Sequence, residues 1–193
     1  MKTKFVFFIF LSTISLTFCK VEEQTPYKFK NFFIKDEALE LNKILNYFDS
    51  KIEAKISSGD IAMCYTEFCD SIKKDFKKGL VSFDTLGINM VLTSKFANNI
   101  WMPNYGFQLD SLRNKTKKLY YNYNSKGKYF EYLKYYSMEN DNIKNYYNSI
   151  IQVGGIGPSA NNIMLNCKTL DFSDENIRLI FAIHWITYFS NYL

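Results

Sequence analysis

The side chains that most often perform catalysis are scarce in this sequence. His184 is the single histidine of the 193 residues, and its neighbours Ile183, Trp185 and Ile186 are apolar. One histidine excludes histidine-rich metal sites and makes any Ser-His-Asp triad depend on that residue. We therefore interpret His184 as a hydrogen-bonded structural residue, and we expect no catalytic residue, no metal site and no cofactor.

Four carboxylates lie in or near a helix that the sequence predicts over 60–78. They are Glu67, Asp70, Asp75 and Asp84. Glu67 and Asp70 are three residues apart, which puts them on one face of a helix. Glycosidases use two carboxylates at a fixed separation, so a hydrolase of envelope polymers is an alternative hypothesis. A solvated helix face is the simpler interpretation of the same residues.

The stretch 154–158, Gly-Gly-Ile-Gly-Pro, is rich in glycine. A phosphate-binding loop would need a preceding strand and a following Lys-Ser or Lys-Thr pair, and neither is evident. Clustered glycine and proline are typical of a turn that ends a helix. We predict such a turn here.

A segment rich in Tyr, Lys and Asn, over 117–147, is the strongest candidate for a binding surface. Tyrosine offers a rigid ring with a polar tip, which suits contacts with sugars or proteins. These rings cannot all face a core, so we expect some to be exposed. Codon bias in a low-GC genome, together with partial burial, is the alternative explanation. The candidate patch consists of Tyr120, Tyr121, Tyr123, Tyr129, Tyr132 and Tyr135.

The first residues of the chain indicate export. Lys2 and Lys4 precede an unbroken apolar run over 5–11, Ser and Thr interrupt the residues that follow, and charged residues begin at Lys20. A short basic end, an apolar core and an abrupt switch to polar sequence are the parts of a secretory signal. The apolar stretch is shorter than the ~20 residues that a membrane span requires. We predict a signal peptide over 1–18.

The tetrad Leu16-Thr17-Phe18-Cys19 resembles the lipobox of small bacterial lipoproteins, with Phe18 at the position where a small residue is usual. The resemblance implies that Cys19 is diacylated and becomes the mature N-terminus, followed by a tether over 19–33. Two acyl chains hold a protein stably on a membrane. The protein would then be lipid-anchored in the cell envelope, facing the periplasm or the surface. Secretion without acylation and an uncleaved N-terminal anchor are the alternatives.

Charge and composition narrow the classes of partner. The formal net charge of +5 falls to +3 once Lys2 and Lys4 leave with the signal peptide. This is too weak to indicate a nucleic-acid partner, and export argues further against one. An apolar fraction of 47% is ordinary for a globular core. We expect a single helical domain over 34–193, the membrane as one partner through the lipid, and a protein or a glycan as another.

Three cysteines remain after Cys19, namely Cys64, Cys69 and Cys167. An odd number argues against a disulfide scaffold. Cys64 and Cys69 would point apart on a continuous helix. A bridge from either one to Cys167 is geometrically freer, and three buried thiols are the alternative.

Hydrophobic periodicity predicts a mainly α-helical fold. Helices over 36–56 and 60–78 are expected to be antiparallel neighbours, because only a Ser-Ser-Gly link joins them. Further helices are expected over 143–151 and 160–167. The last one, from an N-cap at Ser173, is apolar nearly all round and should be central. Between these, we expect a short strand or extended link over 80–92, a short helix over 96–101 and a turn over 104–106.

Two interpretations fit residues 119–133. Residues 124–127 could turn a hairpin between tyrosine-rich strands. Alternatively, Gly127 could start a helix with Phe130, Leu133 and Tyr136 facing the core, which is the favoured interpretation. The expected fold is a compact antiparallel bundle of about five to seven helices, with or without a short β-hairpin around 119–133.

Size, export and the lack of a catalytic motif favour a non-enzymatic binding or interaction module, for example an inhibitor or an immunity-like protein. The hydrolase described above is one alternative. A surface protein that contacts glycans through the segment 117–147 is another.

Overall fold

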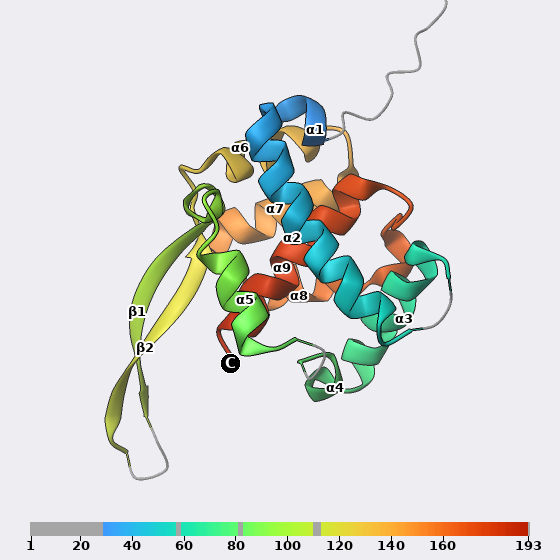
Figure 1. Cartoon of the computed structure of the whole chain (residues 1–193). Helices are drawn as coiled ribbons and strands as arrows, with labels where there is room; N and C mark the ends of the chain where they lie inside the picture. The colour runs from blue at the N-terminus through green and yellow to red at the C-terminus, as the bar shows by residue number, and fades with distance from the viewer. Residues whose placement is uncertain (1–28, 57–58, 81–82, 110–112, 193) are drawn as a thin grey trace, which may run out of the picture.

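Helices form the body of the molecule, and one antiparallel hairpin projects from it (Figure 1). The hairpin consists of β1 (Trp101–Leu109) and β2 (Lys115–Tyr123). The expected mainly α-helical fold with a short hairpin is therefore confirmed. The computed structural model describes residues 29–56, 59–80, 83–109 and 113–192. The predicted signal peptide and Cys19 lie outside these residues.

The described body starts with α1 (Phe29–Phe32) and α2 (Lys35–Glu53). Phe29 is fully buried, and its N–H donates to Asn176 Oδ1 at 2.7 Å. Residues 29–33 thus belong to the body rather than to the tether expected over 19–33. The carboxylate of Glu37 accepts the N–H of Ile34 at 3.1 Å, which satisfies a backbone donor at the start of α2. The apolar stripe of α2 is buried as predicted, at Leu41, Ile44, Leu45, Phe48 and Ile52.

The helix expected over 60–78 is interrupted. It consists of α3 (Ile61–Lys74) and the short α4 (Phe76–Leu80), with Asp75 extended between them. Asp75 breaks the helix because its carboxylate accepts the N–H of Lys77 at 3.1 Å, a local bond that competes with helix continuation. Helix α2 ends earlier than the expected 36–56, with Ala54 as its C-cap, while Asp60 caps the start of α3. Gly59 has φ +72°, and Asp60 Oδ1 accepts the N–H of Ala62 at 2.9 Å.

The strand or extended link expected over 80–92 is wrong, because α5 (Thr85–Leu92) occupies most of it. Asp84 starts this helix by accepting the N–H of Gly87 at 2.6 Å. A short apolar run suits a buried helix and a strand equally, and here the cap decides for the helix. The next segment forms only a 3₁₀ turn, η1 (Ala97–Asn99), in place of the short helix expected over 96–101.

The hairpin does not turn at the expected place. Residues 104–106, expected as a turn, lie inside β1, and the chain reverses between Leu109 and Lys115. The hairpin therefore spans 101–123 rather than 119–133, and shares only 119–123 with the expected one. Gly127 instead precedes α6 (Lys128–Tyr136), so the favoured helix at this position is confirmed.

The C-terminal half is helical, as predicted. It contains α7 (Asp141–Val153), α8 (Pro158–Met164), η2 (Cys167–Thr169) and α9 (Glu175–Ser190). Gly154, with φ +72°, ends α7, which confirms the predicted helix-terminating turn. The N-cap of α9 is Asp174, one residue after the expected Ser173.

Helix α9 is the central element of the bundle. Its side chains from Asn176 to Thr187 are buried, apart from Arg178. In Figure 1 this helix runs behind α2, with the other helices arranged around the pair. No helix within the described residues is both long enough and apolar enough to cross a membrane.

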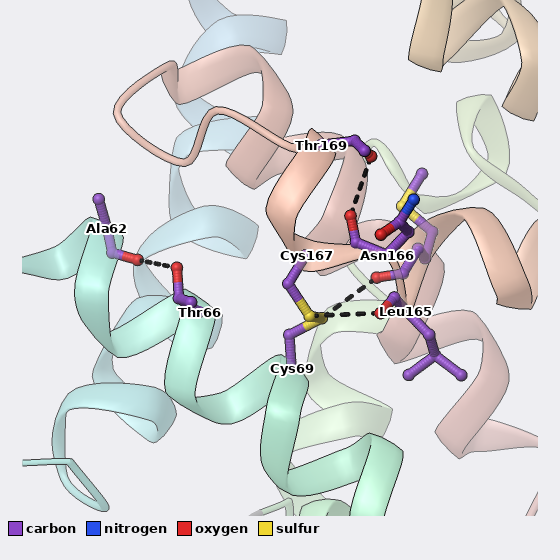
Figure 2. The surroundings of a disulfide bond; sticks show 8 residues. Ala62, Thr66, Cys69, Leu165, Asn166, Cys167 and Thr169 are labelled. Carbon is purple, nitrogen blue, oxygen red and sulfur yellow. Dashed lines mark hydrogen bonds between the residues drawn. A yellow bond between two sulfur atoms is a disulfide. The ribbon is translucent and has the colours of Figure 1, made fainter.

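A disulfide joins Cys69 on α3 to Cys167 on η2, across a Cα–Cα distance of 6.1 Å (Figure 2). The bridge to Cys167 that the sequence left open is therefore the one observed, and the alternative of three thiols is wrong. Cys64 is a buried thiol whose Sγ lies 3.6 Å from the carbonyl oxygen of Ile56. The two bridged residues are 98 positions apart in sequence, so the bond fastens the C-terminal segment to the second long helix.

Candidate functional site

The projecting hairpin, which we term the arm, is anchored to the body at its base. Trp101 and Tyr123 form a cross-strand pair, and both side chains are buried. The indole N–H of Trp101 donates to Thr187 Oγ1 at 2.6 Å, and this hydroxyl donates to the carbonyl oxygen of Ile183, also at 2.6 Å. The first pair of the arm is thus fixed to the central helix α9.

A second buried chain of hydrogen bonds supports the same base. The hydroxyls of Tyr123 and Tyr146 lie 2.8 Å apart, and Tyr146 Oη lies 3.0 Å from His184 Nδ1. Complete burial lowers the pKa of His184 to about 3, because the charged imidazolium loses its hydration. His184 is therefore a neutral residue inside the core, hydrogen-bonded as expected.

Beyond its base the arm has one apolar face. Directly opposed residues share a face of a sheet, and alternate pairs share the same face. The pairs Tyr105–Leu119 and Phe107–Lys117 therefore lie on the same side as the buried pair at the base. The exposed fractions are 62% for Tyr105, 73% for Phe107 and 38% for Leu119. We term Tyr105, Phe107, Lys117 and Leu119 the arm face.

Lysine flanks the aromatic residues of the arm face. Lys117 Nζ lies 4.0 Å from the centroid of the Tyr105 ring, within the range of a cation–π contact. Across the described part of the arm, residues 101–109 and 113–123, every charged side chain is basic. These side chains are Arg113, Lys115, Lys117 and Lys118.

The edges of the arm are partly closed to another strand. Asn191 Oδ1 accepts the N–H of Tyr121 at 2.9 Å, and Asn191 Nδ2 donates to the Tyr121 carbonyl oxygen at 3.3 Å. The N–H and C=O groups of Tyr121 therefore point away from β1. Its cross-strand partner Pro103 must likewise point its C=O away from β2, and as a proline it has no N–H at this position. The N–H of Tyr105 donates to Asn104 Oδ1 at 2.9 Å. The arm is therefore better suited to contact through its face than through its edges.

A hollow of about 670 Å³ lies between the arm and the C-terminal end of α9; we term it the basal hollow. The hydroxyls of Tyr188 and Tyr192 are 3.1 Å apart, and their ring centroids are 5.0 Å apart. Lys118 Nζ donates to the carbonyl oxygen of Asn191 at 3.0 Å. The lining residues are Phe107, Gln108, Lys118, Tyr120, Tyr121, Asn122, Ile156, Tyr188, Asn191 and Tyr192.

The six candidate tyrosines do not form one surface. Tyr123, Tyr129 and Tyr132 are buried in the core, so they cannot belong to a binding patch. Tyr129 and Tyr132 lie on the inner face of α6, where Tyr132 Oη donates to Asn176 Oδ1 at 2.9 Å. Half-burial is observed at Tyr120 and Tyr121, which line the basal hollow, and at Tyr135, whose ring centroid lies 5.8 Å from that of Phe32.

Several site residues were not anticipated from sequence, namely Tyr105 and Phe107 on the arm and Tyr188 and Tyr192 at the C-terminus. Tyr188 and Tyr192 are four residues apart, a spacing that puts two side chains on one helical face. This spacing could have identified the two tyrosines as a pair from the sequence. The residues of β1 gave no such signal, because a proline and a glycine interrupt the strand pattern.

The four carboxylates near α3 act as caps or as solvated groups. Glu67 and Asp70 are exposed, and Asp75 caps α4. Asp84 pairs with Lys51 Nζ at 2.7 Å. Their arrangement is that of a solvated surface, which is the simpler of the two interpretations given for these carboxylates.

Another carboxylate, Asp49, has an altered acidity. Burial raises its pKa, and the hydroxyl of Tyr65 donates to it at 2.6 Å. Arg178 Nε lies 4.0 Å from the same carboxylate. This group links α2, α3 and α9, so we assign it to the packing of the body.

The sequence matches no family model, and neither a curated protein nor a solved structure shows significant similarity to it.

Proposed function

We propose that this chain is an exported, lipid-anchored binding module that docks onto a protein partner through the arm face. The observation that carries the proposal is the exposure of Tyr105 and Phe107 on a hairpin that extends away from the helices (Figure 1). An isolated two-stranded hairpin is marginally stable in water. Exposed aromatic side chains on a projecting hairpin suit the centre of a protein–protein interface.

Charge indicates the chemistry of the partner. The described part of the arm carries four basic side chains and no acidic one, and Lys117 stands beside the aromatic centre. An apolar centre with a basic rim complements an apolar patch with an acidic rim. The partner we propose is therefore an acidic protein. Occupying a functional site of that partner would make this chain an inhibitor or an immunity-like protein.

The proposed location rests on the leader sequence, the lipobox-like tetrad and the disulfide. Disulfides persist in oxidising compartments outside the cytosol, and Cys69–Cys167 suits such a place. Acylation of Cys19 would hold the body close to the membrane while the arm stays available.

The test compares two pairs of exposed apolar residues. Tyr105→Ser with Leu119→Ser removes the centre of the arm face without touching the lining of the basal hollow. Leu86→Ser with Met90→Ser is the matched control, since these residues of α5 are 73% and 68% exposed. Each full-length variant is immobilised, and the partner captured from cell envelopes is quantified by mass spectrometry.

We expect the arm variant to lose at least about tenfold in capture of an acidic protein, which corresponds to about 1.4 kcal/mol. The control should retain capture, and Lys117→Glu should weaken capture most at low salt. Equal capture by the arm variant and the unmodified chain would refute the proposal. So would a partner that is lost only from the α5 control.

A further inference from the structure

We propose that the basal hollow is a binding site for an acidic saccharide, with a sugar carboxylate held by Lys118. This site is distinct from the arm face, although Phe107 borders both. The volume of about 670 Å³ lies within the ≈ 300–1,000 Å³ that is usual for small-molecule sites.

The walls of the hollow suit a sugar ring. Tyr188 and Tyr192 stand side by side with their rings tilted by 42°, and Tyr192 is 55% exposed. Tyr120 and Tyr121 line the hollow from β2, on its other side. A pyranose presents C–H groups on its flat faces and hydroxyls at its rim, so it gains dispersion contacts with aromatic rings while its hydroxyls stay hydrated or bonded.

Amide side chains provide polar partners for those hydroxyls. Gln108 and Asn122 line the hollow, and each amide can donate through nitrogen and accept through oxygen. The amide of Asn191 is already bonded to the backbone of Tyr121 through both of its ends. It therefore holds the wall in place, and Gln108 and Asn122 are the amides that we assign to the ligand.

The charge of the lining selects an acidic ligand. Lys118 is the one charged side chain among the described lining residues. Its ammonium group has three N–H donors and gives one to the Asn191 carbonyl oxygen, which fixes its position. A half-buried, oriented ammonium is suited to a charge-assisted bond with a carboxylate such as that of a hexuronic acid.

The experiment titrates the full-length chain with two probes of equal length, a tetramer of glucuronic acid and glucose and a neutral tetramer of glucose. Tryptophan and tyrosine fluorescence reports binding. Lys118→Gln removes the proposed carboxylate partner, and Lys117→Gln is the matched control, since it changes the neighbouring lysine outside the hollow. Tyr192→Ala tests the aromatic wall, with Tyr105→Ala as its control.

We expect saturable binding of the acidic tetramer, weakened about tenfold by Lys118→Gln and by Tyr192→Ala, with both controls unchanged. Thermal melting of each variant verifies that the fold is kept. Equal affinity for the neutral tetramer, or equal loss in Lys117→Gln, would overturn the assignment of Lys118. Absence of saturable binding to either tetramer would overturn the site. Neither result bears on the capture measured with Tyr105→Ser and Leu119→Ser.

Discussion

The indole N–H of Trp101 donates to the hydroxyl of Thr187 at 2.6 Å, and this bond connects the first residue of the arm to the central helix. The two residues are 86 positions apart in sequence. Both are buried, so water cannot replace the bond if one partner is removed. The direction of the arm relative to the body therefore depends on this contact and on the hydrogen bond of the opposing Tyr123 to Tyr146.

We expect Thr187→Val to lower the free energy of unfolding by about 1–3 kcal/mol, because the shape is kept while a buried indole N–H loses its acceptor. Urea denaturation measures the loss. Hydrogen exchange should accelerate at amides of the strand ends near Trp101 and Tyr123 more than in α3. Ser190→Ala, near the exposed end of α9, is the control, since its hydroxyl only bonds the Thr187 carbonyl oxygen at 2.8 Å. Equal stability of Thr187→Val and the unmodified chain would contradict this role.

The disulfide should contribute strongly to stability. Cross-linking residues 98 positions apart restricts the unfolded chain, and a loop of this length is associated with about 3–5 kcal/mol. Reduction should lower the urea midpoint accordingly. In peptide mapping, Cys69 and Cys167 should react with iodoacetamide only after reduction. Cys64→Ala should leave both the mapping result and the effect of reduction unchanged. Alkylation of Cys167 in the unreduced, unfolded chain would be incompatible with the bridge.

The helices were predictable because their information is local. Residues such as Leu41, Leu45, Phe48 and Ile52 repeat at helical spacing, and Asp60 and Gly154 mark helix ends whatever the rest of the chain does. The break at Asp75 was missed because one side-chain hydrogen bond decides it. The apolar period runs across the break to Phe76, so the sequence pattern gives no sign of the interruption.

The arm was harder to predict because its pairing is non-local and its outer part is exposed. Pro103 and Gly106 suggest a turn, yet both fit β1 because of the partner strand. Pro103 lies where no N–H is needed, and Gly106 leaves room for the Tyr120 ring, which would lie 2.7 Å from a Cβ at this position. In α6, Tyr136 is buried as expected, whereas Tyr129 and Tyr132 are buried although they were expected in the surface patch. Their successive spacings, three residues to Tyr132 and four more to Tyr136, put all three on the same buried face of the helix.

Two glycines are required for different physical reasons, and substitution should distinguish them. A Cβ at Gly127 would lie 2.2 Å from the backbone oxygen of Asn99, so Gly127→Ala should lower the unfolding free energy by about 2–3 kcal/mol through overpacking. Gly154 has φ +72° and open space around it, so Gly154→Ala should cost only about 1–2 kcal/mol of backbone strain.

Asparagine separates these two causes. It tolerates the left-handed region, so Gly154→Asn should restore most of the stability that alanine loses, while Gly127→Asn should be at least as damaging as alanine. Thermal or urea unfolding of the four variants makes the comparison. A rescue by asparagine at residue 127 would show that sterics are not the reason for glycine there.

The anchor makes a prediction in producing cells. If the lipobox resemblance of Leu16-Thr17-Phe18-Cys19 holds, radiolabelled palmitate enters the protein and Cys19→Ala abolishes the label. The variant should also leave the membrane fraction, since a chain without both acyl groups is held only weakly. Cys64→Ala serves as the control because its thiol is buried. Unchanged labelling of Cys19→Ala would contradict acylation at this residue.

His184 should make the fold sensitive to acid. Burial lowers its pKa in the folded chain to about 3, whereas the unfolded chain has an ordinary pKa of about 6.5. Between these values the unfolded state binds more protons than the folded state, so the free energy of unfolding rises with pH by up to about 1.4 kcal/mol per pH unit. The stability that neutral His184 contributes is complete above its pKa in the unfolded chain. It is lost as the pH falls toward its pKa in the folded chain.

The measurement is urea unfolding at about pH 4.5 and about pH 7, for the unmodified chain and for His184→Leu. Leucine cannot titrate, and it loses the bond to Tyr146, so this variant should be less stable at neutral pH but should lose less stability on acidification. Carboxylates titrate in both proteins, so their effect cancels in the difference. An identical pH dependence of the two proteins would mean that His184 can become charged inside the folded chain, and would contradict its burial against Tyr146.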